Sequence, residues 1–165
     1  MHLKKYLLLP IAALCLTACA NSAGAKPCDI DEKFSCRVTM THHEKQYTAD
    51  VKRADADVWE MEFSQPDTVK GMKIGLTGKV CTMEFMGLKY ELDRSSLGGM
   101  SMADTCCGAV EKLIGKTDVS CSKEGEDIIE KASLNGQDFS ARFKDGELKE
   151  ISFPGELKYE FENSQ

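Results

Sequence analysis

Apolar and polar side chains alternate along most of the chain with a period of two residues. In residues 34–41, for example, Phe34, Cys36, Val38 and Met40 alternate with polar neighbours. Successive side chains of a strand point to opposite faces of a sheet, so this pattern predicts a strand with one buried face. The alternation recurs in residues 47–52, 59–64, 72–76, 81–85, 88–92, 119–121, 139–143 and 157–161, and Leu148 and Ile151 mark one further short segment. Residues 127–134 fit either a strand or a helical turn, and we expect nine or ten strands in all.

Short polar turns separate these segments. The strongest hairpin signal is Asn135-Gly136, because both residue types tolerate a positive φ, and Asp145-Gly146 repeats it. Strands joined by such short turns pair with their neighbours in antiparallel fashion. The pattern therefore predicts one large antiparallel sheet with a polar face and an apolar face.

The period changes to that of a helix between residues 101 and 115. Ser101 is a suitable N-cap with Asp104 three residues later, and Gly115 suits the C-cap position. Asp104 and Glu111 are expected on the face turned away from the sheet. The apolar positions of this helix are Met102, Ala103, Cys106, Cys107, Val110, Leu113 and Ile114.

One helix and a large sheet predict an α+β, β-dominated domain. A sheet of this size must twist and curl, so we expect a curved half-barrel that covers one amphipathic helix. Such a shape can leave an apolar hollow between sheet and helix. The residues expected to line it and to contact a hydrophobic ligand are Trp59, Met61, Phe63, Phe85, Met100 and Met102.

The order of these elements resembles the lipoprotein-carrier fold of the LolA and LppX group. The resemblance is carried by residues 59–66 and 69–72, with a proline-bearing turn between them, and by residues 77–80 and 87–92. GerS-like lipid-anchored proteins are similar as well. The resemblance implies a LolA-like domain that binds lipid or lipoprotein without catalysis. Residues 28–33 are too few for the long first helix of the carriers, which puts lipoprotein-sized cargo in doubt.

The first residues have the features of a secretory signal. Lys4 and Lys5 precede an apolar run over residues 6–16, which is about half of what a membrane-spanning helix needs. Residues 16–19, Leu-Thr-Ala-Cys, resemble the lipobox of bacterial lipoproteins, although an ordinary signal peptidase could also cut near Ala18. The resemblance implies cleavage after Ala18 and a diacylglyceryl group, with palmitate as a typical acyl chain, on Cys19.

These features divide the chain into a signal peptide (1–18), a lipidated tether (19–27) and one domain (28–165). We therefore expect a protein of the bacterial cell envelope, outside the cytoplasm and anchored to a membrane by lipid. The 165-residue chain has a net charge of −6, and loss of Lys4 and Lys5 makes it −8. Such an acidic chain is unsuited to nucleic acid or to anionic headgroups, so membrane attachment must come from the acyl chains.

Six cysteines remain in the predicted domain: Cys28, Cys36, Cys81, Cys106, Cys107 and Cys121. In an exported domain they are candidates for disulfides, with 15 possible connectivities. The alternative is that they are reduced and pack as small apolar side chains. Adjacent Cys106 and Cys107 are poorly placed to bridge each other.

Candidate chemistry is otherwise sparse. His42 and His43 are adjacent, so in a strand they point to opposite faces and cannot both bind one metal. We expect no metal, no cofactor and no enzymatic activity. The sequence leaves two functions open: an acyl chain or hydrophobic peptide bound in the hollow, or a protein–protein scaffold with a filled core. For the scaffold, the last strand, residues 157–161, is the expected exposed edge that pairs with an envelope protein.

Overall fold

A computed structural model describes residues 25–97 and 101–163 of the chain. It contains eleven strands, one α-helix and one short 3₁₀ helix, η1. Their bounds are β1 (Phe34–His42), β2 (Lys45–Asp55), β3 (Val58–Gln65), β4 (Lys73–Thr77), β5 (Val80–Phe85), β6 (Leu88–Asp93), η1 (Arg94–Leu97), α1 (Met102–Gly115), β7 (Ser120–Glu124), β8 (Asp127–Leu134), β9 (Gln137–Lys144), β10 (Glu147–Phe153) and β11 (Leu157–Asn163).

All eleven strands form one antiparallel sheet in the order β6-β5-β4-β3-β2-β1-β11-β10-β9-β8-β7. The ambiguous segment, residues 127–134, is a strand, and it raises the count above the nine or ten expected. The hairpins at Asn135-Gly136 and Asp145-Gly146 are confirmed, and all four residues have positive φ. Each chain half is a meander, and the two meanders join where β1 pairs with β11.

The expectation that residues 157–161 form an exposed edge was wrong. β11 lies in the middle of the sheet, between β1 and β10, with Val38 opposite Phe161. The free edges are β6 and β7. Period-two alternation reports which face of a strand is buried, but it does not report which strands lie beside it.

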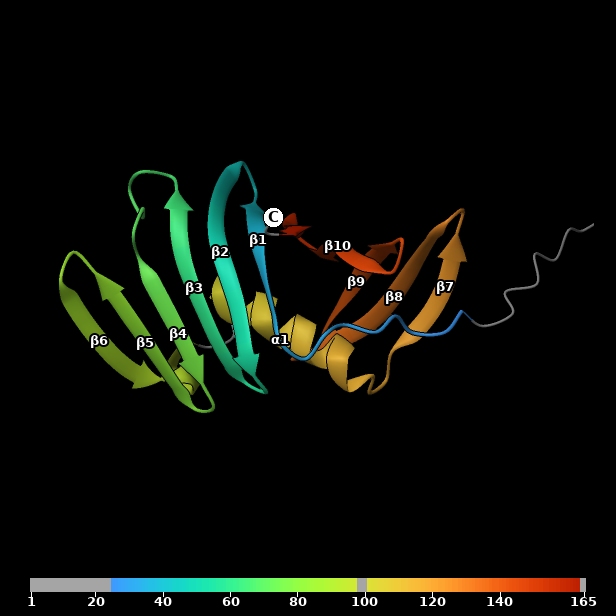
Figure 1. Cartoon of the computed structure of the whole chain (residues 1–165), viewed down its shortest axis with the longest axis horizontal. Coiled ribbons are helices and arrows are strands. Elements are labelled where there is room, and N and C mark those ends of the chain that lie inside the picture. Colours follow the sequence, from blue (N-terminus) through green and yellow to red (C-terminus); the bar gives the residue numbers. More distant parts are fainter. Residues whose placement is uncertain (1–24, 98–100, 164–165) are drawn as a thin grey trace, which may run out of the picture.

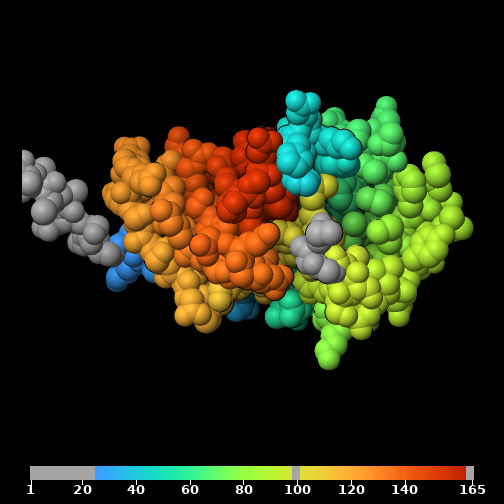
Figure 2. All heavy atoms as spheres, turned by 180° about the vertical axis from the view of Figure 1, so that it is seen from behind, coloured from blue at the N-terminus to red at the C-terminus, as the bar shows by residue number. Residues whose placement is uncertain are grey.

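The sheet curls around α1, which lies between its two halves (Figure 1). Seen from behind, little of the helix is visible between the green and the orange-red strands (Figure 2). The inner face and the helix share one apolar core, which includes Val38, Trp59, Val110, Leu113 and Tyr159. The predicted fold class, a β-dominated half-barrel that covers one amphipathic helix, is confirmed.

The two ends of α1 are capped, one as predicted and one differently. The Ser101 hydroxyl accepts a hydrogen bond from the Asp104 N–H at 3.4 Å, as an N-cap does. At the other end Gly115 is the last helical residue, and Lys116 takes the left-handed conformation with φ 50°. Within residues 25–97 and 101–163, α1 included, no helix is long and apolar enough to cross a membrane.

Candidate interaction surface

Around Trp59 the interior of the half-barrel is filled by side chains of the protein. Trp59, Met61 and Phe63, three of the residues expected to contact a ligand, are 1%, 2% and 4% exposed. Cys106 and Cys107 of α1 are buried in the same core. Since protein atoms already cover these side chains, a ligand could reach them only if α1 moved. A hollow of 530 Å³ opens instead on the polar outer face, around Gly75.

A cluster of hydrogen bonds around Glu111 holds α1 against β2 and β3. The Glu111 carboxylate accepts hydrogen bonds from the Arg53 guanidinium at 2.9 Å, from the Trp59 indole N–H at 2.8 Å and from the Asp57 N–H at 3.0 Å. Arg53 is 3% exposed and Glu111 21%. Burial raises the pKa of Glu111, but these hydrogen bonds outweigh it and leave the pKa below its ordinary value. The expectation that Glu111 faces away from the sheet was wrong, because the curled sheet meets the helix on more than one side.

Arg94 fixes the end of β6 to the start of α1. Its guanidinium pairs with Asp104, in the first helical turn, and lies 3.5 Å from the Asp57 carboxylate. Its backbone N–H donates to the Lys79 carbonyl at 2.7 Å. Asp104 is therefore also held in an ion pair, with a 14% exposed side chain, and is not a solvent-facing charge.

The sheet extends well beyond the helix. An α1 of 14 residues is about 21 Å long, whereas eleven strands span roughly 48 Å across the sheet if laid flat. One helix cannot cover the whole inner face. The uncovered part lies on the hairpin of β5 and β6.

This hairpin carries an exposed apolar surface, which we name the β5–β6 patch: Met83, Phe85, Met86, Leu88 and Tyr90. On the inner face Met83 lies opposite Tyr90 and Phe85 opposite Leu88. Leu88 and Tyr90 are 58% and 55% exposed, and Met86 at the turn is 86% exposed. Exposed apolar side chains that gather in this way mark interaction surfaces.

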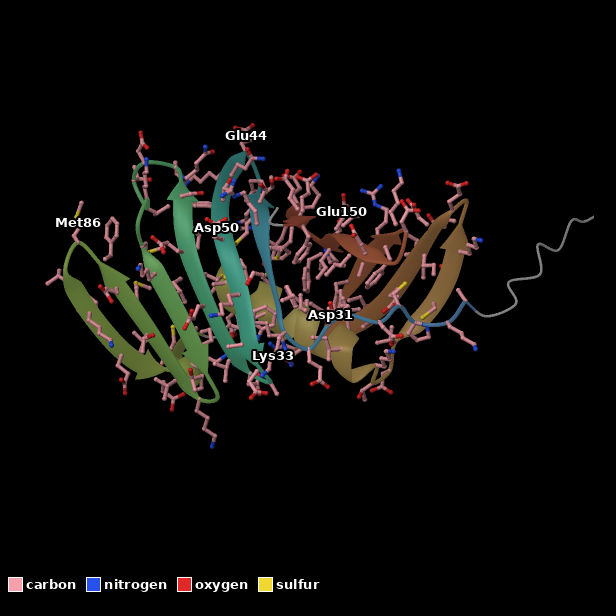
Figure 3. All side chains as sticks on the ribbon, viewed as in Figure 1. Asp31, Lys33, Glu44, Asp50, Met86 and Glu150 are labelled. Atoms are coloured by element: carbon pink, nitrogen blue, oxygen red, sulfur yellow. The ribbon has the colours of Figure 1, made fainter. Side chains whose placement is uncertain are left out.

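The β5–β6 patch and residues 25–28 lie at opposite ends of the molecule. Met86 projects from the tip of the outermost hairpin (Figure 3), while the chain enters beside β7 and β8 (Figure 1). The Cys28 N–H donates to the buried Glu130 carboxylate of β8 at 2.6 Å and so fixes the entering segment. Burial raises the pKa of Glu130, and the Cys28 hydrogen bond and the Lys116 charge oppose that shift.

The six cysteines of the domain are free thiols in the structure. Cys121 is partly exposed, and the other five are buried. Burial raises the pKa of the Cys36 thiol to about 12, and the pKa of Cys107 is also raised well above its ordinary value. Thiols with such pKa values are protonated and poor nucleophiles near neutral pH. The pairing of these cysteines stays a prediction.

Other predicted site residues are exposed or lie outside the described residues. The rings of His42, at the end of β1, and His43, in the following turn, lie 4.3 Å apart between centroids and are tilted by 36°, and both residues are exposed. Phe85 and Met102 are half-buried, whereas Met100, Ala18 and Cys19 lie outside the described residues. Within residues 25–97 and 101–163, no three His, Cys, Asp or Glu side chains are grouped to hold a metal.

Sequence reasoning missed Leu88, Tyr90 and Met86 as surface residues. The strand that contains Leu88 and Tyr90 has the same alternation as the buried strands, so the pattern alone predicts a covered inner face. The signal that was present is the ratio of one 14-residue helix to so many strands. That ratio implies that part of the apolar face is left open.

The course of the backbone is similar to that of several solved structures. An uncharacterized conserved protein from Thermus thermophilus matches with a TM-score of 0.45 and 13% identity, over 80% of both chains. A LolA superfamily protein from Nitrosomonas europaea matches with a TM-score of 0.41 and 11% identity, over 83% of this chain and 89% of the other. No family model and no curated protein matches the sequence.

Proposed function

We propose that this chain is a non-enzymatic, lipid-anchored protein of the bacterial cell envelope that binds another polypeptide at the β5–β6 patch. The observation that carries the proposal is the contrast between the two parts of the inner face. Around α1 the face is filled, with Trp59 1% exposed, whereas on β6 Leu88 and Tyr90 are more than half exposed. The second of the two functions considered above, a scaffold with a filled core, fits this contrast.

The position of the patch supports binding of a polypeptide in particular. β6 is an edge strand, so its free edge offers backbone N–H and C=O groups to a further strand. Strand addition at a sheet edge combines backbone hydrogen bonds with pockets for alternate side chains. Residues 25–28 lie beside β7 and β8, at the far end of the domain from the patch, so the patch is free to face a partner (Figure 1).

An acyl chain in the half-barrel is the competing function. To admit it, α1 would have to leave the sheet and break the hydrogen bonds between Glu111 and Arg53. Breaking a buried ion pair and emptying a packed core are both costly. The filled interior therefore favours the scaffold.

Photo-crosslinking in the producing bacterium tests the proposal. The full chain would carry p-benzoylphenylalanine in place of Tyr90, and in place of Glu60 on the outer face of β3 as the matched control. We expect a protein adduct at Tyr90 that is absent at the control. A lipid adduct at Tyr90 would overturn the proposal in favour of acyl carriage, and equal adducts at both positions would overturn it as well.

A further inference from the structure

We propose that the polypeptide bound at the β5–β6 patch is a second copy of this chain, whose β6 strand pairs antiparallel with β6 around a two-fold axis at Tyr90. This inference rests on the proposed function, since it names the partner of the same surface. It follows from the direction of the backbone groups of β6, from the order of its side chains and from the exposure of the patch.

The turn between β5 and β6 determines which backbone groups of β6 are free. Met86 and Gly87 both have positive φ, 52° and 78°, as in a two-residue type I′ hairpin. In such a hairpin the residues that flank the turn, Phe85 and Leu88, exchange their hydrogen bonds, and hydrogen-bonded pairs then alternate. Tyr90 therefore bonds to β5, and the backbone groups of Lys89 and Glu91 point to the free edge.

The side chains of β6 are complementary to themselves. Residues 88–92 read Leu-Lys-Tyr-Glu-Leu, so apolar ends flank a basic and an acidic residue around a central tyrosine. Antiparallel pairing centred on Tyr90 places each Lys89 opposite the second copy's Glu91. Opposite charges in directly facing positions stabilise a strand pair, and like charges destabilise it.

This register also pairs the free backbone N–H and C=O groups of β6 with those of the second copy. Lys89 and Glu91 carry the outward N–H and C=O groups, so their two facing pairs would be the hydrogen-bonded ones. The two Tyr90 residues would form a non-hydrogen-bonded pair, the type with the closer side chains. Tyr90 and Leu88 lie on the inner face, so pairing would cover the residues that are now exposed.

A second copy fits this edge better than an unrelated partner. A two-fold interface brings the same surface of both subunits together, so it requires self-complementarity, which residues 88–92 have. A charge on an edge strand ordinarily discourages pairing. Here the charge of Lys89 would be met by the second copy's Glu91. The other edge, β7, reads Ser-Cys-Ser-Lys-Glu and lacks both the symmetry and the large apolar side chains.

A single strand pair is a small interface and is expected to be weak in dilute solution. Anchoring both copies to one membrane through Cys19, as proposed, would raise their effective concentration without any new contact. The experiment should therefore use the mature lipidated chain in phosphatidylcholine vesicles. Self-association is measured by energy transfer between copies labelled after Gln165.

Charge reversal at the edge is the test. Lys89→Glu makes every facing pair acidic, and Glu91→Lys makes every facing pair basic, so each variant should self-associate about tenfold more weakly or worse. A mixture of the two variants places an acidic strand against a basic one, and we expect it to recover the wild-type signal. Glu60→Lys, on the exposed outer face, is the matched control and should leave association unchanged.

The outcomes separate this inference from the proposed function. Recovery in the mixture, but not in either variant alone, supports pairing through β6. Association of Lys89→Glu as strong as that of the wild type would overturn it. No self-association, combined with a Tyr90 adduct to another protein, would overturn the second copy as partner and leave the proposed function standing. If neither self-association nor a protein adduct at Tyr90 is observed, this inference and the proposed function are both overturned.

Discussion

Glu111 is the residue on which the contacts between the helix and strands β2 and β3 converge. Replacing it with Gln keeps the shape but removes the charge that faces Arg53, which is 3% exposed. We expect Glu111→Gln to lower the free energy of unfolding by about 2–3 kcal/mol near pH 7. Glu60→Gln, at an exposed position, is the matched control and should change it by less than about 0.5 kcal/mol. Urea unfolding of both variants measures the difference.

The effect of Glu111→Gln should depend on pH. The folded-state pKa of Glu111 lies below its ordinary value of 4.5, so its stabilising contribution is complete above that value. It is lost as the pH falls through the folded-state pKa, because the carboxylate must then be protonated. The gap between wild type and Glu111→Gln should therefore shrink as the pH falls below 4.5 and through the folded-state pKa. A gap that stayed constant into acid would show that the ion pair does not account for it.

At the scale of the element, Gly75 sets the close approach of β4 to β5. A Cβ at this position would lie 2.6 Å from Thr82 Oγ1, and the χ1 angle of threonine is stiff. We expect Gly75→Ala to lower the free energy of unfolding by about 1–3 kcal/mol. In a Thr82→Ala background, Gly75→Ala should lower the free energy of unfolding much less, because Thr82 Oγ1 is no longer present. A double-mutant cycle by thermal unfolding measures this coupling, and additive costs would contradict it.

The positions of the strands along the chain were largely predictable from the sequence. Which strands pair with one another was not. Alternation in residues 34–41 and 139–143 placed β1 and β9, and Asn135-Gly136 placed the hairpin turn before β9, because these signals depend on local geometry. The pairing of β1 with β11 joins residues more than a hundred positions apart, and no local pattern encodes it. The same limit applies to the candidate site, since the exposure of Tyr90 depends on where α1 ends relative to β6.

At the scale of the whole molecule, the lipid anchor proposed at Cys19 is the feature to test first. The lipobox resemblance predicts that Cys19→Ser abolishes fatty-acid labelling and moves the protein from the membrane fraction to the soluble fraction. Cys15→Ser, within the apolar run of the signal, is the matched control and should leave both unchanged. Metabolic labelling with an alkyne fatty acid, followed by fractionation, measures the two effects. Persistent labelling of Cys19→Ser would place the lipid elsewhere or refute lipidation.

Residues 25–28 and the β6 edge lie at opposite ends of the long axis (Figure 1). In a monomer, a single attachment to the membrane would leave the domain free to rotate about that point. In the proposed pair, residues 25–28 of the two copies would lie at the two far ends of a continuous sheet. With both ends held, the long axis would lie parallel to the bilayer, and the same face of the sheet would always be presented to the surroundings. Pairing would thus fix the orientation of the domain relative to the membrane.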